Sequence, residues 1–211
     1  MEIMKQNKNP SFNKEKELLS KKILVFGIDE VGRGSFAGPI VASAVHFKKE
    51  YSWFNEINDS KLLTPRKREH LSKLILKNAV CFVELIDVAI INEFGIGKAN
   101  KLIFENLIKK IRKEYKDKRI YFLIDGRRLD LNLEDVEFIV KGDQKSISIA
   151  ASSIVAKVYR DKLMKNLGKK YSGYAFSKNK GYGTKFHQKA IKKLGLSEIH
   201  RTSFNLQKFL S

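Results

Sequence analysis

The chain has 211 residues, with 42 Lys or Arg against 23 Asp or Glu, which gives a formal net charge of +19. Its length fits one domain with a sizeable core, and no apolar run is long enough to cross a bilayer. The first twenty residues lack the apolar segment of a secretory signal, so we expect a cytoplasmic protein rather than a membrane or exported one. The single cysteine, Cys81, cannot form an intrachain disulfide.

The positive charge is concentrated in one part of the chain. Between Lys157 and Lys193 there are twelve basic residues and one acid, Asp161, so this segment carries +11 of the net charge of +19. Six Tyr and Phe residues lie among them. Basic and aromatic residues together suit phosphate contacts and base or sugar stacking, although a solvated helix face with core aromatics would show the same pattern. The distribution favours nucleic acid over a membrane surface as the partner.

The apolar periodicity predicts a series of strands and helices after a polar N-terminal tail or short helix over residues 1–22. Thr64 and Pro65 mark the first helix start, as an N-cap and a first-turn proline. The predicted strands are residues 23–26, 40–47, 79–88, 119–124 and 136–140. The predicted helices are 65–77, 96–116, 147–167 and 185–194, with a cap or short helix in 197–211.

Two antiparallel strands followed by strands alternating with helices indicate an α/β protein with a mixed central sheet flanked by helices. We expect residues 23–211 to form one domain, in which about 170–211 are a small helical C-terminal extension.

Acidic residues follow three of the predicted strands. Asp29, Asp125 and Asp143 each come after an apolar strand and lie close to a glycine, and Glu30 is a fourth acid beside the first. Loops converge at strand ends, and carboxylates brought together there need cations to offset their repulsion. All-oxygen ligands suit Mg²⁺ or Mn²⁺, whereas the four histidines have no zinc-ligand spacing. Alternatively, each acid only caps a turn or helix, and Asp143 could cap the helix starting near Ser146.

Several blocks of sequence carry a resemblance. The stretch GIDEVGRGSFAGPIVASAV, which begins at Gly27, is similar to the signature of the type 2 ribonucleases H, specifically ribonuclease HII. The blocks DSKLLTPRKREHL, FLIDG, KGDQKSISIAASSIVAKVYRD, GYGT and HRTSF follow in the order of that family. Together they cover most of residues 23–205.

The resemblance implies a ribonuclease H-like fold and an endoribonuclease that hydrolyses the RNA strand of RNA–DNA hybrids. It also implies cutting 5′ of ribonucleotides embedded in duplex DNA, with two divalent cations, Mg²⁺ or Mn²⁺, leaving 5′-phosphate and 3′-hydroxyl ends. The catalytic metal ligands of the family map onto Asp29, Glu30, Asp125 and Asp143. Asp161 is a rival, which we rank lower because its helical position beside Arg160 favours a salt bridge.

The same resemblance assigns substrate contacts. The backbone of Gly32, Arg33 and Gly34 would approach the minor groove, and Tyr182 would pack on the sugar at the RNA–DNA junction. Further predicted phosphate contacts are Ser60 and Lys61, with Thr184 a weaker candidate. Leu62 departs from the family, which usually has Lys there. The presence of Arg33 and the short N-terminal segment favour type HII over the type 3 enzymes.

The partner implied is an RNA–DNA hybrid or a DNA duplex that contains ribonucleotides, bound by a monomer, with no membrane. A sliding clamp is possible as a second partner, but residues 207–210 match a clamp-binding motif too incompletely to support it. We expect Arg127 and Arg128 to be solvated, and His200 and Arg201 to pack the C-terminal segment.

Two other function classes fit the sequence less well. A basic nucleic-acid-binding module without activity would explain the charge but not the acids at strand ends. A dinucleotide-binding enzyme that uses the glycine-rich loop of residues 32–38 would need a helix after that loop. We reject it because residues 40–47 are predicted as a strand.

Overall fold

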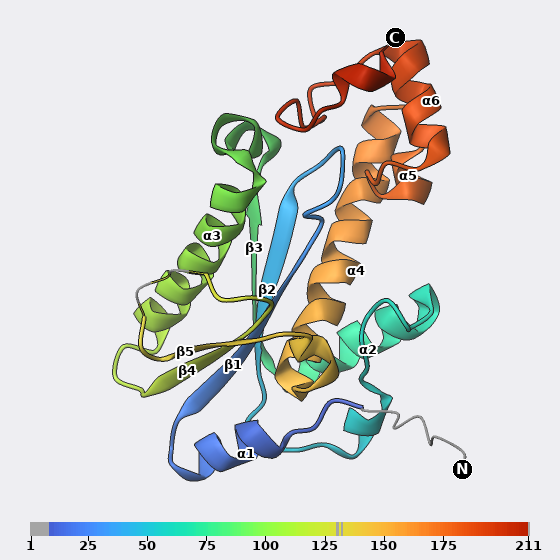
Figure 1. Ribbon diagram of the computed structural model, residues 1–211. Helices are drawn as coiled ribbons and strands as arrows, with labels where there is room; N and C mark the ends of the chain where they lie inside the picture. Colours follow the sequence, from blue (N-terminus) through green and yellow to red (C-terminus); the bar gives the residue numbers. More distant parts are fainter. Residues whose placement is uncertain (1–8, 130, 132, 211) are drawn as a thin grey trace, which may run out of the picture.

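The computed structural model describes residues 9–129, 131 and 133–210, and it shows a five-stranded sheet with helices on both faces (Figure 1). The strands are β1 (Leu24–Val31), β2 (Ile40–His46), β3 (Val80–Ile86), β4 (Ile120–Asp125) and β5 (Val136–Ile139). The helices are α1 (Asn13–Ser20), α2 (Pro65–Asn78), α3 (Val88–Glu114), α4 (Ile147–Lys170), α5 (Phe176–Asn179) and α6 (Lys185–Leu194). Short 3-10 turns are η1 (Ser52–Glu56), η2 (Gly142–Gln144) and η3 (Gln207–Phe209). This is the mixed α/β architecture that the sequence predicts.

The sheet has the strand order β3-β2-β1-β4-β5, with β1 in the centre. Strand β2 is antiparallel to both of its neighbours, whereas β1, β4 and β5 are parallel to one another. In the register, Ile28 pairs with Ile124, and Asp125 pairs with Ile139. The carboxyl ends of β1, β4 and β5 therefore meet at the same edge of the sheet, which is where ligand sites form in such folds.

Opposite faces of the sheet pack on different helices because side chains alternate along a strand. Phe26 and Ile28 of β1 join the core under α3, whereas Val25 packs against Ile149 of α4. Helix α4 approaches β1 very closely, since a Cβ added to Gly27 would lie 2.2 Å from the carbonyl carbon of Ser148. The small residues at the start of α4 allow this close approach.

Most predicted elements are confirmed, and two boundaries are wrong. Helix α6 spans the predicted residues, and the Thr64 hydroxyl caps α2 by accepting from the Lys67 N–H at 3.3 Å. Strand β1 does not end before its acids but continues to Val31, because β2 keeps pairing with it as far as Val31 and Val41. Helix α3 begins well before the predicted residue 96 and passes through a kink at Gly95, whose φ is +79°.

The N-terminal segment packs against the domain. Phe12 contacts the rings of Phe47 and Phe54, with centroids 6.4 and 5.2 Å away. The buried Glu15 accepts hydrogen bonds from the Ser146 hydroxyl at 2.6 Å and from the Ser148 N–H at 2.9 Å. Helix α1 thereby caps the N-terminus of α4 from outside, next to the turn that carries Asp143.

The C-terminal helices extend beyond the end of the sheet, where they surround the C-terminal half of α4 (Figure 1). Their shared core contains Ala37, Met164, Tyr174, Phe176 and Ala190, so it includes one residue of the β1–β2 loop. A strand, β2, follows that loop, which contradicts the dinucleotide-binding alternative. None of the described helices has an apolar stretch long enough to cross a lipid bilayer.

Candidate active site

Three neighbouring strands bring the predicted acids together. The pairing of Ile28 with Ile124 sets the next residues, Asp29 and Asp125, side by side on β1 and β4. Asp143 lies in η2, the turn that follows β5. Because β1 is longer than predicted, Asp29 and Glu30 lie within the strand and not in the loop after it. Asp29 is buried against α4, where its own N–H donates to the Ser152 hydroxyl at 2.9 Å.

The carboxylates are oriented by backbone groups. One oxygen of Asp29 accepts from the Glu30 N–H at 2.7 Å, and one oxygen of Asp125 accepts from the Gly142 N–H at 2.6 Å. Asp143 does not cap α4, since the Ser146 hydroxyl accepts from the Ile149 N–H at 3.2 Å instead. The alternative in which Asp143 is only a helix cap therefore has no support.

Burial raises the pKa values of Asp29, Glu30 and Asp143, and the charges of neighbouring acids raise them further. Burial raises the pKa of Asp29 well above its usual range, and the charges of Glu30 and Asp125 raise it further. Burial raises the pKa of Glu30 to about 7, against the opposing charge of Arg33 and with a further contribution from Asp125. The pKa of Asp143 is also raised, by burial and then by Asp125. Such a cluster is stable in its ionised form only beside compensating positive charge.

Lys61 supplies part of that charge. Burial would lower the pKa of its ammonium group, but the charges of Asp59, Asp143, Asp29 and Asp125 raise it. The buried Asp59 orients the loop by accepting from the Lys61 N–H at 2.9 Å. Asp59 was not among the site residues predicted from the sequence. Its position two residues before Lys61, in the DSK block, could have indicated its role.

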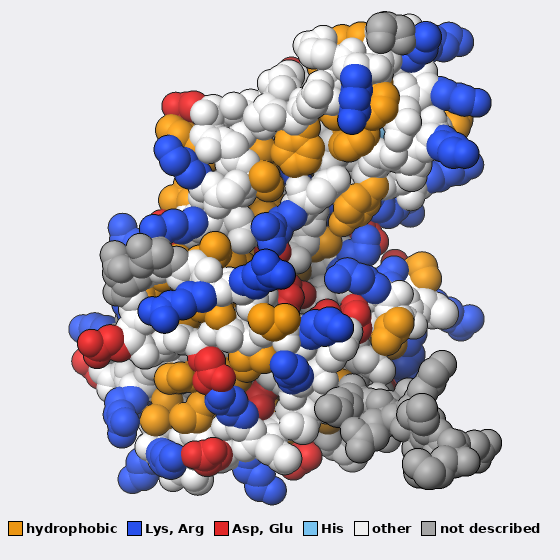
Figure 2. All heavy atoms as spheres, in the orientation of Figure 1, with side chains coloured by type: hydrophobic (Ala, Val, Ile, Leu, Met, Phe, Trp, Pro, Cys, Tyr) orange, Lys and Arg blue, Asp and Glu red, His pale blue; other side chains and the backbone are white. Residues whose placement is uncertain are grey.

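One cavity of about 390 Å³ contains six of the predicted residues. Its lining residues are Asp29, Glu30, Val31, Ser60, Lys61, Asp125, Ser153, Lys157 and Tyr182. Figure 2 shows acidic atoms in a hollow near the middle of the molecule, with Lys and Arg side chains around it. Ser153 and Lys157 were missed, because a serine and a lysine inside a long helix give no signal for a site.

The other predicted substrate residues lie outside this cavity. Gly32 packs on Arg160: its φ is +96°, and an added Cβ would lie 2.2 Å from the Arg160 Nε. Arg33 is exposed with its guanidinium 3.5 Å from Glu30, and Gly34 is also exposed. Thr184 lines a separate hollow, where its hydroxyl caps α6 by accepting from the His187 N–H at 3.3 Å. Arg127 and Arg128 are exposed, as expected.

The predicted salt bridge between Asp161 and Arg160 is wrong. Asp161 pairs with Lys157, 2.7 Å away and one helical turn earlier, whereas Arg160 is completely buried and donates only to backbone carbonyls. Adjacent residues on a helix point in different directions, which is why the partner is four residues away.

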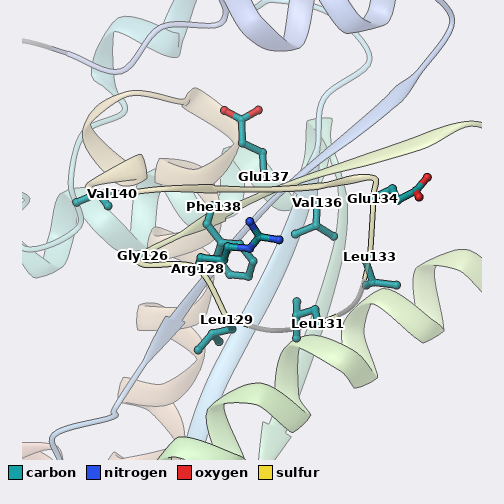
Figure 3. Close-up of a pocket in the computed structure, with 10 residues that line it drawn as sticks. All are labelled: Gly126, Arg128, Leu129, Leu131, Leu133, Glu134, Val136, Glu137, Phe138 and Val140. Carbon is teal, nitrogen blue, oxygen red and sulfur yellow. The ribbon is translucent and has the colours of Figure 1, made fainter.

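A larger hollow of about 590 Å³ lies under the connection from β4 to β5. Figure 3 shows mainly apolar side chains around it, including Leu131, Val136 and Phe138. Glu137 points away from these side chains, and it forms an ion pair with Lys14 of α1. The apolar lining offers little to a metal ion or a phosphate, so the acid-lined cavity is the candidate active site.

The donor chemistry of this cavity fits divalent cations. Among the residues that the structure describes, no three Asp, Glu, His or Cys side chains already stand close enough together to hold a metal ion. The four acids must therefore rotate toward one another to share one. Their oxygens are nevertheless the ligands that Mg²⁺ and Mn²⁺ prefer, and the raised pKa values of Asp29, Glu30 and Asp143 are consistent with a site that binds cations.

Metal binding is expected to stabilise the protein more strongly at high pH than at low pH. An acid whose pKa is raised in the folded state costs stability as the pH rises from its unfolded pKa through its folded pKa, which for Glu30 is about 7. Cations bind the ionised carboxylates, so they offset this cost only where the acids are deprotonated. Thermal denaturation with Mn²⁺ or EDTA should give a larger metal-induced rise in Tm at about pH 8 than at about pH 5.5. An equal rise at both pH values, or an undiminished rise in Asp125→Asn, would contradict binding at this cluster.

The fold matches that of solved nucleases. The ribonuclease HII of Archaeoglobus fulgidus, solved in complex with PCNA, has a TM-score of 0.74 at 23% identity, covering 86% of this chain and 95% of the other. The Bst-RNase HIII solved with Mn²⁺ has a TM-score of 0.70 at 19% identity, covering 89% and 69%. The fold and the clustered acids thus define a protein of the ribonuclease H-like class.

Sequence relatives narrow this class to one family. The family model of ribonuclease HII matches residues 26–207. The ribonuclease HII of Fusobacterium nucleatum is 46% identical over 193 residues, covering 88% of this chain and 87% of the relative. That of Lactobacillus delbrueckii is 42% identical over 195 residues, covering 92% and 74%. The chain belongs to the ribonuclease HII family. It is a metal-dependent nuclease with ribonuclease H activity on RNA–DNA hybrids.

Proposed function

We propose that this ribonuclease HII cuts the RNA strand of hybrids and also cuts on the 5′ side of single ribonucleotides embedded in duplex DNA. The observation that carries the proposal is the shared cavity in which three of the acids, Asp29, Glu30 and Asp125, lie beside Lys61 and Tyr182. Carboxylates can hold cations, a lysine can bind a phosphate, and an aromatic ring can pack on a sugar or base. These are the three contacts that an enzyme acting on a backbone phosphodiester next to a ribose requires.

The four acids Asp29, Glu30, Asp125 and Asp143 would hold two divalent cations in the proposed reaction. Bound there, the cations would supply the charge that activates a water and stabilises the leaving 3′ oxygen, and the products would carry 5′-phosphate and 3′-hydroxyl ends. The protein itself need not supply a nucleophile. The two serines of the cavity, Ser60 and Ser153, hydrogen-bond to each other at 2.7 Å, and none of the described lining residues is a histidine that could activate them.

We assign Tyr182 to the ribonucleotide because of how its loop is anchored. Its backbone forms a β-bridge with Ser35, and the Gly181 carbonyl accepts from the Phe36 N–H at 2.8 Å. The tyrosine loop is therefore joined to the glycine-rich loop, whose exposed backbone at Gly34 can approach a minor groove. We assign Tyr182 to the sugar at the RNA–DNA junction and the glycine-rich loop to the 2′-hydroxyl.

A basic cleft next to the cavity supports a duplex substrate. The cleft, about 590 Å³, lies among α2, α4 and α5. Its basic residues are Arg68, Lys157, Lys162, Lys165, Lys178 and Lys180, with Glu69 and Asp161 as the only acids in the lining. Lys157 lines both the cleft and the acid cavity, so the two are adjacent. Phosphates of a duplex cut at the acids can therefore extend into the cleft.

We propose that the enzyme acts on this substrate as a cytoplasmic monomer in replication and repair. Because the Archaeoglobus fulgidus ribonuclease HII was solved in complex with PCNA, a sliding clamp is a plausible second partner.

The chemistry of the cut ends tests the proposal. With Mg²⁺ or Mn²⁺, a DNA duplex with one ribonucleotide should be cut once, on the 5′ side of the ribonucleotide. The upstream fragment should then be extended by a DNA polymerase, because it ends in a 3′-hydroxyl. An all-DNA duplex of the same sequence should remain intact. A cut on the 3′ side with a 2′,3′-cyclic phosphate would contradict the proposal, since that product comes from attack by the 2′-hydroxyl and not by water.

A further inference from the structure

Two histidines outside the active site are buried in direct contact with each other. His187 lies in the first turn of α6, and His200 lies in the segment after α6, where it bridges to Ala37. Both are fully buried, and their Nε2 atoms are 3.0 Å apart. The rings of Tyr174 and Phe176 surround the pair, with centroids 4.9 Å from His200 and 5.2 Å from His187 respectively.

The hydrogen bonds around the pair determine where each proton lies. The Ser197 N–H can only donate, and it is 2.8 Å from the Nδ1 of His200, so this nitrogen carries no proton. The proton of a neutral His200 is then on Nε2, and it is donated to the Nε2 of His187. His187 must therefore carry its own proton on Nδ1, which is 3.0 Å from the carbonyl oxygen of Tyr182.

The reverse order of protons makes poorer contacts. It would place a lone pair of His187 against the Tyr182 carbonyl, and it would leave the Nδ1–H of His200 facing the Ser197 N–H with only the Ser197 carbonyl, 3.3 Å away, as an acceptor. A second proton on either ring would set two N–H donors against each other inside the protein. Burial lowers the pKa of His187, and burial together with the charge of His187 lowers the pKa of His200 to about 4. Both rings are therefore neutral at neutral pH.

This series of hydrogen bonds ends at a residue of the candidate active site. Starting from the Ser197 N–H, the donors run through His200 and His187 to the backbone of Tyr182, whose ring lines the acid cavity. We propose that His187 and His200 are positioning residues, which hold the backbone of Tyr182 against the glycine-rich loop and so keep its ring in place for the ribonucleotide. This inference rests on the proposed function, because that function assigns Tyr182 to the sugar.

Kinetics of His200 variants test the inference on the duplex with one ribonucleotide. His200→Phe keeps a ring but leaves the His187 Nε2 and the Ser197 N–H unpaired, and a displaced contact group should lower kcat/KM by about 10- to 100-fold. His200→Gln can accept from Ser197 and donate to His187, so it should retain most of the wild-type kcat/KM. A loss in His200→Gln as large as that in His200→Phe would overturn the proposal.

A double-mutant cycle separates positioning from general destabilisation. If the pair acts through Tyr182, His200→Phe should change kcat/KM by less than about 2-fold once Tyr182→Ala has removed the ring. The full loss in the Tyr182→Ala background would overturn the inference. Cleavage by the wild-type enzyme is the reference, so failure of the proposed function would be recognised before any variant is compared.

The proton positions can be checked without activity, even if a variant does not fold. Imidazole nitrogen chemical shifts of the wild-type protein at neutral pH should show His200 protonated at Nε2 and His187 protonated at Nδ1. Any other pair of tautomers would overturn the proposed chain of hydrogen bonds.

Discussion

Replacing Asp29 by asparagine is expected to reduce kcat by on the order of 10³-fold, because one preorganised electrostatic group contributes about 10²- to 10³-fold to turnover. Asp29 is buried, and the charges of Glu30 and Asp125 both raise its pKa. Asparagine has nearly the same shape but cannot offer two anionic oxygens to a cation. The measurement is single-turnover cleavage of the duplex with one ribonucleotide, in Mg²⁺ and in Mn²⁺.

Binding of the same duplex should not weaken in Asp29→Asn, and it should strengthen when metal is absent. The acid cluster repels backbone phosphates unless cations neutralise it, so removal of one negative charge reduces that repulsion. Glu105→Gln, the same chemical change in an exposed ion pair with Lys101 on α3, should leave both cleavage and binding unchanged. An active Asp29→Asn would contradict a catalytic role for the acid cluster. It would favour the alternative of a basic nucleic-acid-binding module, and the observed cleavage would then need another source.

The sequence predicted the grouping of the acids better than it predicted the local chain around them. The grouping could be predicted because each acid follows an apolar run, and the parallel order of β1, β4 and β5 brings the carboxyl ends of these strands together. The true end of β1 could not be predicted from the run of residues 23–26. Its length is set by pairing with β2, which lies about fifteen residues later in the chain. This pairing continues beyond the acids. Long-range pairing of this kind overrides local propensity.

The least predictable features are the buried charges. Arginine is rarely buried, so nothing in the local sequence indicates that Arg160 lies fully inside the protein, and the expected packing of Arg201 on the C-terminal segment did not indicate its full burial. Glu15 belongs to a stretch that resembles a solvated tail, yet it is buried against α4 because α4 offers an unpaired N–H there. In each case the partner is a backbone group that becomes available only in the folded chain. Periodicity of side chains carries no information on such groups.

Arg160→Met is expected to destabilise the protein by about 3–5 kcal/mol, as the removal of one side of a buried charged network does. The guanidinium donates to three carbonyls, those of Pro39 at 2.9 Å, Lys180 at 2.8 Å and Ala37 at 3.1 Å. Methionine fills the space but leaves all three carbonyls unpaired. For a chain of this size, the loss corresponds to a fall in Tm of about 10 °C. Arg66→Met, a change at an exposed position, should lower Tm by about 1–2 °C at most.

The loss should extend to catalysis, because the same carbonyls anchor the glycine-rich loop. Arg201 holds the loop from the other side, donating to the Gly38 carbonyl at 2.9 and 2.8 Å and to the Arg33 carbonyl at 2.8 Å. Arg160→Lys keeps the charge but cannot direct donors to three separate carbonyls, so it should fall between wild type and Arg160→Met in both Tm and kcat/KM. If Arg160→Met kept the wild-type Tm and activity, the bridges of Ser35 with Tyr182 and of Ala37 with His200 would be sufficient to hold the loop. The expected loss would instead show that a helix on one face of the sheet and the C-terminal segment jointly fix the backbone that we propose contacts the substrate.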